Sequence, residues 1–518
     1  MDTLLTLAYS FLGFLLLIYS LNCFVMVYLF LRRKKEADQT DESMVQDLFL
    51  HQTPPHVTTQ IPVFNECNVI ERCIHAVCRM KYLKGLHEIQ ILDDSTDETS
   101  ELINRLVDSY RALGVDIKVI RREARTGFKA GALNNGLQQA KGDLLALFDA
   151  DFIPPDDFLL KTVPNFLKND RLGFVQARWS HLNSNVSLLT RAQEIGIDGH
   201  FMVEQAARAW NGLYMNFNGT AGVWRKKTIL SSGGWQWDTL TEDMDLSYRI
   251  QIEGWKPLFI YDLAVPAELP EDVHAFKSQQ FRWAKGSIQT AKKLLPIILK
   301  GKDSWFKKFQ AIMHLSHYIV YPLMLMLALL SYPVLMTNHF HESPVYYPLN
   351  TLILLLALIA PNSVYLTSQL IINGCRFSKL LMLSSVVLIG VGAVVSNSIG
   401  VFEALIGRNS DFIRTPKKGE VIKKKYSVKR IYVAWYELVL GLYCLFVFIS
   451  YIQAGRFWMG PFLFIYSVGF LYFGIVSLTS SGKDPFVLRD VFKKLLKRNS
   501  LGGDSVTETE TELFSSMA

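Results

Sequence analysis

Closely spaced cysteines are missing from this chain. Its 518 residues include six cysteines, and no two of them form a Cys-x-x-Cys pair. We therefore expect the cysteines to be small buried hydrophobic residues rather than zinc ligands. Nucleic-acid-binding motifs are also missing. The formal net charge of +7 is better explained by basic stretches, such as residues 423–425, that lie against anionic lipid headgroups.

Charge is missing from the first apolar segment, residues 4–31, which is longer than the roughly 20 residues needed to span a hydrocarbon core. A cleavable signal peptide would need basic residues before this segment and a small-residue cleavage site after it. Instead, the basic cluster at residues 32–35 follows the segment. We predict an uncleaved membrane anchor. Because Lys and Arg beside a span stay cytoplasmic, the next domain is expected to be cytosolic.

Hydrophobic residues make up 50% of the chain, which is typical of a membrane protein. Further apolar runs occupy residues 312–336, 349–372, 380–401, 431–452 and 457–478. If all of them crossed the membrane, the basic residues 408–430 would lie outside, against the positive-inside bias. We therefore predict that residues 380–406 are in-plane or re-entrant, bent with the help of Gly390, Gly392 and Gly400, and that the chain has five spans.

Short apolar runs alternate with amphipathic stretches between the anchor and the later spans. The expected strands are residues 57–63, 89–92, 117–120 and 144–148, and the expected helices lie near residues 71–80, 98–113 and 129–140. This alternation predicts βαβ units in a Rossmann-like α/β domain. Ligands of such sheets bind at the carboxyl ends of the strands, so polar residues that follow a strand are candidates for a site.

The predicted order of segments follows from these patterns. It is an anchor (1–35), a linker (36–56), a cytosolic α/β domain (57–285), interfacial helices (286–310), two spans (311–373), an in-plane or re-entrant segment with a loop (374–430), two spans (431–480) and a partly disordered cytosolic tail (481–518).

Asp149 and Asp151 follow the fourth predicted strand. Alternate residues of a strand share a face, so these carboxylates can hold a divalent metal and the diphosphate that the metal bridges. The alternative is a loop that only caps the next turn, before Pro154 and Pro155.

Asp93 and Asp94 end an earlier strand, where one carboxylate can accept hydrogen bonds from a nucleotide base or ribose. The alternative is a helix cap, with Asp97 in that role. Phe64 and Glu66 end the first strand and are also expected to face the nucleotide.

Lys129 lies among small residues, where a ligand can approach the backbone and the ammonium can reach a phosphate. A solvated lysine is equally compatible with this spacing.

Glu242 and Asp243 precede an amphipathic helix, and we assign Asp243 as the candidate general base for an acceptor hydroxyl. A single displacement with this base would invert the anomeric centre. Capping of the helix is again the alternative.

Gln279, Arg282 and Trp283 lie on neighbouring faces of one predicted helix. They offer an amide, a bidentate cation for diphosphate and an indole platform for a sugar ring. An amphipathic helix at the membrane surface would also contain Arg and Trp without any catalysis.

Two loops complete the candidate site. The small polar segment 216–222 is a candidate acceptor loop or a plain strand turn, and it contributes Asn218, Gly219 and Thr220. Segment 411–417 has many donors and could close over the diphosphate, or it is a plain basic loop at the membrane surface.

Together these motifs resemble the inverting, processive membrane glycosyltransferases of the cellulose synthase superfamily, especially the plant mannan and glucan synthase-like branch. The resemblance covers residues 57–417 and rests on Asp-x-Asp, Thr-Glu-Asp and Gln-x-x-Arg-Trp in that order. It implies a GT-A fold in the cytosolic domain, an all-α transmembrane region with interfacial helices, and a donor-bound divalent metal, Mg²⁺ or Mn²⁺.

The resemblance also implies individual roles. Asp93 or Asp94 corresponds to the uridine-binding aspartate, Lys129 to the phosphate-region lysine and Asp243 to the catalytic base. The Gln-x-x-Arg-Trp residues would bind the diphosphate and the growing polymer end. Phe412, Thr415 and Lys417 look like the gating loop that covers the nucleotide in polymer synthases. Two departures from cellulose synthases make cellulose a poor candidate product: Arg414 replaces the usual valine of the gating loop, and residues 217–220 look more like the mannan synthase branch.

Three hypotheses follow. The first is a hexosyltransferase that polymerises a β-glucan or β-mannan from a nucleotide-diphosphate sugar, preferably a UDP-sugar and alternatively a GDP-sugar, and passes the growing glycan across the plasma, inner or Golgi membrane. The second is a non-processive enzyme similar to ceramide glucosyltransferases, with a lipid acceptor. The third is a channel or scaffold with a degenerate transferase domain, against which the full set of carboxylates argues. We favour the polymerase.

Overall fold

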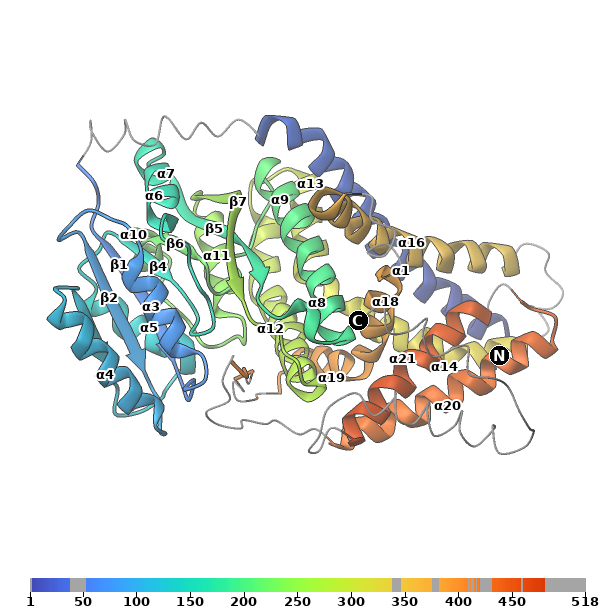
Figure 1. The fold of residues 1–518 in the computed structure, drawn as a ribbon. Coiled ribbons are helices and arrows are strands. Elements are labelled where there is room, and N and C mark those ends of the chain that lie inside the picture. The colour runs from blue at the N-terminus through green and yellow to red at the C-terminus, as the bar shows by residue number, and fades with distance from the viewer. Residues whose placement is uncertain are drawn as a thin grey trace.

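The computed structural model of the chain describes residues 2–37, 53–337, 346–374, 382–408, 410, 414–415, 417–419, 431–457 and 460–479. The sheet domain lies at one end of the molecule and the long apolar helices lie at the other (Figure 1). The predicted tail, most of the linker, the basic stretch 423–425 and Phe412 lie outside the described residues.

The domain is built on a seven-stranded sheet with the order β3-β2-β1-β4-β6-β5-β7. Its strands are β1 (Val57–Val63), β2 (His87–Asp93), β3 (Ile117–Ile120), β4 (Leu144–Leu147), β5 (Leu172–His181), β6 (Gly222–Arg225) and β7 (Lys256–Ala267). The first four strands are parallel to one another, as predicted. The sheet is nevertheless mixed, because β6 runs antiparallel to both β4 and β5. This is the GT-A-like arrangement that the resemblance implied.

Helices cover both faces of the sheet. The predicted helices are found as α3 (Ile70–Arg79), α4 (Thr99–Ala112) and α5 (Phe128–Gln139). Successive side chains of a strand point to opposite faces of the sheet, so the hydrophobic core has two parts. On one face, Leu144 and Ala146 of β4 belong to the same cluster as Ile74 of α3. On the other face, Leu145 and Leu147 belong to the cluster that includes residues of α5. The other elements of the domain are α6 (Phe158–Thr162), α7 (Pro164–Lys168), η1 (Ser184–Val186), α8 (Leu188–Asp198), η2 (Gly199–Gln205), α9 (Ala206–Trp210), α10 (Lys226–Ser231) and α11 (Glu242–Ile252).

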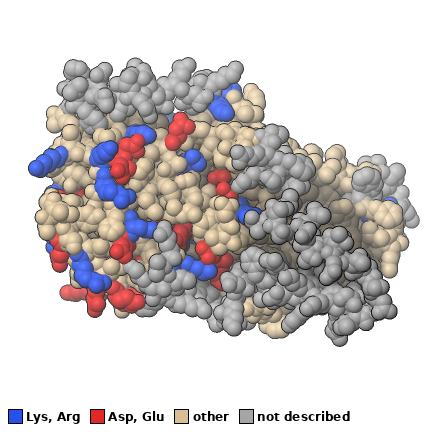
Figure 2. Space-filling model, in the orientation of Figure 1, with Lys and Arg blue, Asp and Glu red and all other residues tan. Residues whose placement is uncertain are grey.

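Five helical segments in the described part of the chain are long and apolar enough to cross a membrane, or six candidate spans if the bent helix pair at residues 383–405 counts as one. They belong to α1 (Asp2–Ala37), η3 and α14 (His317–Ile319 and Val320–Leu335), α16 (Tyr346–Asn373), α20 (Ile431–Gln453) and α21 (Gly460–Thr479). On the face shown in Figure 2, the described charged side chains lie mostly over the sheet domain.

The segment predicted to be in-plane or re-entrant forms two helices, α18 (Leu383–Gly392) and α19 (Val394–Leu405), with a bend of 49° between them. Of the three glycines expected to help the bend, only Gly392 lies next to it. A Cβ atom at Gly392 would lie 2.1 Å from the ring of Phe473, so this glycine also lets α18 approach α21 closely. Whether the bent pair enters the membrane stays a prediction.

Helix α12 (Val273–Lys300) connects the sheet domain to the membrane helices. Its buried Lys277 pairs with Glu437 of α20 at 2.5 Å and donates to the Ser477 hydroxyl of α21 at 2.7 Å. Further along, Lys285 pairs with Glu403 of α19 at 2.8 Å. The next helix, α13 (Trp305–Leu315), exposes 82% of Trp305, as expected for an interfacial helix.

Candidate active site

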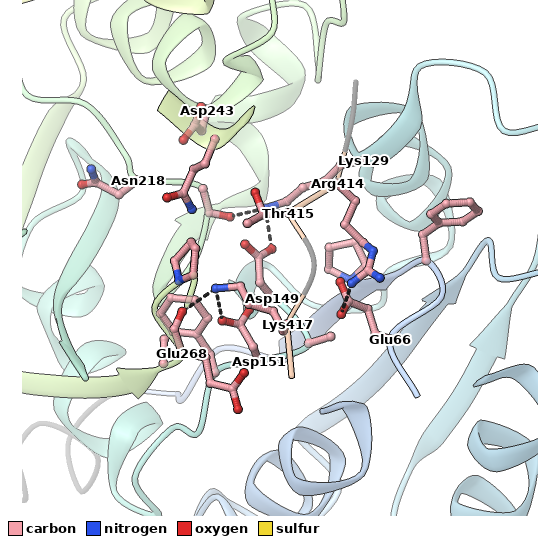
Figure 3. A pocket seen from close by; sticks show the side chains of 18 of the residues that line it. Glu66, Lys129, Asp149, Asp151, Asn218, Asp243, Glu268, Arg414, Thr415 and Lys417 are labelled. Carbon is pink, nitrogen blue, oxygen red and sulfur yellow. Dashed lines mark hydrogen bonds and ion pairs between the residues drawn. The ribbon is translucent and has the colours of Figure 1, made fainter. Parts of the chain in front are cut away.

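One cavity of about 160 Å³ brings together residues from every motif singled out in the sequence (Figure 3). It lies at the carboxyl ends of β1, β2 and β4, where the parallel strands were expected to place a ligand. The predicted residues that line it are Phe64, Glu66, Asp94, Lys129, Asp149, Asp151, Asn218, Gly219, Glu242, Asp243, Gln279, Arg282, Trp283, Thr415 and Lys417. Their chemical roles stay predictions.

Two predicted residues do not line this cavity. Asp93 is 2% exposed; its carboxylate pairs with Arg121 at 2.8 Å and accepts a hydrogen bond from Ser100 Oγ at 2.8 Å. Asp93 therefore orders the loop after β2, whereas Asp94 reaches the cavity. Thr220 is fully buried, and its hydroxyl accepts a hydrogen bond from the Asp149 backbone N–H at 2.8 Å. Its contact positions the first aspartate of the Asp-x-Asp motif.

Asp94 is held by Arg122, whose Nε lies 2.9 Å from Oδ1 and whose Nη2 bonds Oδ2. Arg122 Nη2 also donates to the Phe128 carbonyl at 3.0 Å, which links this loop to the start of α5. The predicted cap at Asp97 is found as well, because its carboxylate accepts a hydrogen bond from the Thr99 N–H at 3.1 Å. Asp97 therefore stabilises the start of α4, and the nucleotide-binding role of Asp94 stays a prediction.

Lys129 links the carboxyl end of β4 to the candidate acceptor loop, residues 216–222. Its ammonium lies 2.5 Å from Asp149 Oδ1 and donates to the Gly219 carbonyl at 2.9 Å. Burial alone would lower the pKa of Lys129, but the charges of Asp149, Glu242 and Asp243 outweigh burial and raise it. Lys129 is therefore a fixed cation among carboxylates and not a solvated lysine.

Asp243 lies in the first turn of α11, where acidic side chains are favourable, and the N-cap residue Thr241 makes no side-chain capping hydrogen bond. Both the stabilisation of the helix start and the role as a base stay open for Asp243. Burial raises the pKa of the Asp243 carboxyl to about 7, the charge of Glu242 acts in the same direction, and Lys129 and Arg282 oppose the rise. A carboxylate with a pKa near neutrality is well matched to the work of a general base.

Gly219 is required in its place for two reasons. Its φ of +79° lies in the left-handed region, where a side chain is unfavourable. A Cβ atom there would also lie 3.2 Å from Asp243 Oδ2. The small residue expected in the acceptor loop therefore allows the backbone to approach the candidate base.

Residues of the predicted gating loop lie in the same cavity. Lys417 pairs with Asp151 at 2.8 Å, and its ammonium also donates to the Glu268 carbonyl (Figure 3). Arg414, the residue that departs from the family pattern, pairs with Glu66 at 2.6 Å. Burial raises the pKa of Glu66 to about 7 despite Arg414, and Asp151 adds to the rise.

Glu268 and Arg125 are two charged residues of this cavity that the sequence analysis missed. Glu268 follows β7, so its position after a strand was the signal that could have identified it; it pairs with Arg72 at 2.7 Å. Arg125 lies with its guanidinium carbon 3.4 Å from the centre of the Phe64 ring, a contact between distant segments that no local pattern reveals.

The fit of a divalent metal can be judged from the carboxylates. The described residues contain no group of three or more His, Cys, Asp or Glu side chains arranged to hold a metal. Asp149 and Asp151 nevertheless both line the cavity, and each has an ammonium against one oxygen. Two hard oxygen ligands fit Mg²⁺ or Mn²⁺ when a diphosphate supplies further oxygens.

A second cavity, of about 570 Å³, continues from the first toward the membrane helices. Asn218, Asp243, Gln279 and Trp283 line both cavities. From these residues the larger cavity extends between α1, α14, α16, α18 and α21, as far as Tyr466. The larger cavity therefore connects the surroundings of Asp243 with the apolar helices.

Comparisons with known proteins identify relatives of this chain. The model of the family described as glycosyltransferase like family 2 matches residues 54–286. The probable glucomannan 4-beta-mannosyltransferase 15 of Arabidopsis thaliana is 33% identical over 477 residues, which cover 88% of this chain and 85% of that protein. The glucomannan 4-beta-mannosyltransferase 7 of the same plant is 34% identical over 464 residues, with 86% and 80% covered.

Among solved structures, the mannosyltransferase PcManGT from Pyrobaculum calidifontis, in complex with GDP-Man and Mn²⁺, is similar at a TM-score of 0.49 and 18% identity, covering 77% of this chain and 100% of that one. This likeness is too low to inform function.

Proposed function

This chain belongs to the family-2-like glycosyltransferases, with the plant glucomannan mannosyltransferases of the cellulose synthase-like group as its relatives, and we propose that it polymerises a β-linked mannan or glucomannan. The proposed donor is GDP-mannose, which replaces the sequence-based preference for a UDP-sugar because the relatives are mannosyltransferases. One observation carries the proposal: Asp149, Asp243 and Trp283, far apart in the sequence, line one cavity.

In this proposal the donor lies with its base near Asp94 and Phe64 and its diphosphate near Lys129 and Arg282. The cations of these two residues would offset the negative charge that grows on the diphosphate as the bond to the anomeric carbon breaks. Asp149 and Asp151 would hold a divalent cation, Mg²⁺ or Mn²⁺, whose charge also stabilises the diphosphate.

Asp243 is the proposed general base. It accepts the proton of the acceptor hydroxyl while that oxygen bonds to the anomeric carbon on the face opposite the leaving diphosphate. A single displacement of this kind inverts the anomeric centre. The acceptor sugar would rest on the indole of Trp283, with the Asn218 amide and the backbone near Gly219 within reach of its hydroxyls.

Processive transfer and passage of the glycan through the protein are further parts of the proposal. The second cavity supports them, because it starts at Asp243 and Trp283 and continues between the apolar helices. The catalytic domain would then face the cytoplasm, and the polymer would leave on the other side of a Golgi or plasma membrane.

The test uses the purified full-length chain in detergent, with Mn²⁺ or Mg²⁺ and radiolabelled GDP-mannose, GDP-glucose, UDP-glucose or UDP-mannose. We expect label from GDP-mannose in a high-molecular-weight product that β-mannanase degrades, and no product from an Asp243→Asn variant. A product with one sugar per lipid acceptor would instead support the ceramide glucosyltransferase-like alternative. Full activity of Asp243→Asn would contradict the assignment of the base.

A further inference from the structure

The helix beside the acceptor loop contains a π-helical turn, η2, between α8 and α9. Such turns are rare and often occur at functional sites, because the wider turn redirects side chains. This one packs tightly against the apolar helix α16: a Cβ atom at Gly199 would lie 2.7 Å from the Tyr365 ring. From η2, His200 and Glu204 reach the 570 Å³ cavity, and Arg208 of α9 reaches it as well.

A chain of hydrogen bonds runs from this turn to the acceptor loop. Gln205 Nε2 donates to the Asn216 carbonyl at 2.8 Å, and this contact fixes the orientation of the glutamine amide. The same nitrogen donates to Asn218 Oδ1. The amide nitrogen of Asn218 must therefore be the donor in its 3.0 Å contact with His200 Nε2.

The tautomer of His200 follows from this orientation. Because Nε2 accepts a hydrogen bond from Asn218, Nδ1 carries the proton and donates to Glu204 Oε2 at 3.0 Å. Glu204 keeps 34% of its side-chain surface accessible and lines the cavity. Burial opposes its ionisation, yet the His200 hydrogen bond and the charge of Arg208 contribute to lowering the pKa of Glu204 overall.

Arg208 adds a buried cation to the same wall. It is 4% exposed, and its guanidinium donates to the Gln310 carbonyl at 3.4 Å, a long hydrogen bond. Within the described part of the chain, Arg208 Nε has no hydrogen-bond partner. Arg208 also lines the cavity, so its guanidinium supplies this wall with hydrogen-bond donors.

We propose that His200, Glu204 and Arg208 form a sugar-binding subsite for the unit behind the terminal sugar of the acceptor glycan. Asn218 and Asp243 line both cavities, whereas these three residues line only the larger one, so they lie beyond the transfer site along the path. A carboxylate accepts hydrogen bonds from sugar hydroxyls and a guanidinium donates to them. The rings of Tyr318 and Tyr365 line the same cavity and supply apolar surface for a pyranose face.

This inference rests on the proposed function, and acceptor length separates the two. The full-length protein is given GDP-mannose with either mannose or β-1,4-mannobiose as acceptor, because only the disaccharide can fill both positions. In Glu204→Gln we expect the KM for mannobiose to rise about 10- to 100-fold, the range for a lost hydrogen bond to a charged group. The KM for mannose and the rate of donor hydrolysis should not change.

Two further variants secure the result. Glu71→Gln is the matched control, because Glu71 and His75 form a similar i,i+4 pair on the exposed side of α3; it should leave both KM values unchanged. Glu204→Asp shortens the same carboxylate, should give the same selective loss, and replaces Glu204→Gln if that variant does not fold.

The outcomes are distinct. An unchanged KM for mannobiose, or an equal rise for both acceptors, would overturn the subsite while leaving the polymerase intact. A wild-type protein that transfers mannose to neither acceptor, nor to a polymer, would overturn the proposed function and the subsite together.

Discussion

The charge of Glu242 should set the pH dependence of sugar transfer through its effect on Asp243. Burial and Glu242 together raise the pKa of Asp243 to about 7. A general base acts in its ionised form, so the rate should rise with pH through this value. For one group with a pKa of about 7, the ionised fraction grows from about 0.1 at pH 6 to about 0.9 at pH 8.

Glu242→Gln removes a neighbouring negative charge and should move the midpoint of the profile to lower pH. A fall of about one pKa unit would raise the ionised fraction at pH 6 from about 0.1 to about 0.5, so relative activity there would increase about fivefold. Burial is the larger cause of the shift, so the midpoint should stay well above the ordinary value for aspartate, about 3.9.

The assay is kcat/KM for transfer from pH 5 to pH 9, with donor affinity measured separately at each pH. Glu66 also has a pKa raised to about 7, but Glu242 is not among the charges that act on it. A shift in Glu242→Gln therefore reports on Asp243. Glu253→Gln, at the exposed end of the same helix, is the control and should not move the midpoint. A midpoint that stays in place or rises in Glu242→Gln would refute the reasoning.

Three other changes have defined consequences. The folded protein holds the proton of Asp243 up to a pH of about 7, so the free energy of unfolding should fall between about pH 4 and 7. Asp243→Asn removes the cost of ionising this buried carboxyl. The variant should therefore be more stable by about 1–4 kcal/mol at pH 8, measured by denaturant unfolding. Gly219→Ala should cost about 1–2 kcal/mol in backbone strain and also reduce kcat, whereas Gly212→Ala, with a φ of +65° and no neighbouring atom within 4 Å, should show the strain alone; equal kcat in the two variants would disprove the contact with Asp243. Lys277→Met should destabilise the protein by about 3–5 kcal/mol, because it leaves Glu437 buried without its cation. The double variant Lys277→Met with Glu437→Leu should recover most of the lost stability in thermal unfolding. No recovery would mean that loss of the ion pair is not the cause.

The sequence predicted most of the fold that positions the site. Runs such as residues 57–63 and 117–120 are short and apolar, and they coincide with β1 and β3. Because parallel strands end at one edge of the sheet, Glu66, Asp94 and Asp149 could be placed together without coordinates. Strands β5, β6 and β7 were not predicted, and a strand as short as β6 carries no sign of its direction.

Long-range partners explain the rest of the differences. Asp93 and Asp94 are adjacent and chemically identical, and only the positions of Arg121 and Arg122 decide which carboxylate faces inward. The π-helical turn at η2 was also missed, because its amino-acid pattern does not differ from that of an ordinary helix. The motifs thus predicted the residue types of the site, and tertiary contacts decided their orientation.

The ion pairs of α12 connect the proposed site to the apolar helices, so we expect activity to depend on the surrounding bilayer. Helix α12 contains Gln279, Arg282 and Trp283. The same helix forms ion pairs with α20 through Lys277 and with α19 through Lys285. Asp243, in contrast, belongs to the sheet domain. A lipid mixture that is too thin or too thick would tilt α20 and displace the indole from the carboxylate. Turnover in nanodiscs should therefore peak at one acyl-chain length.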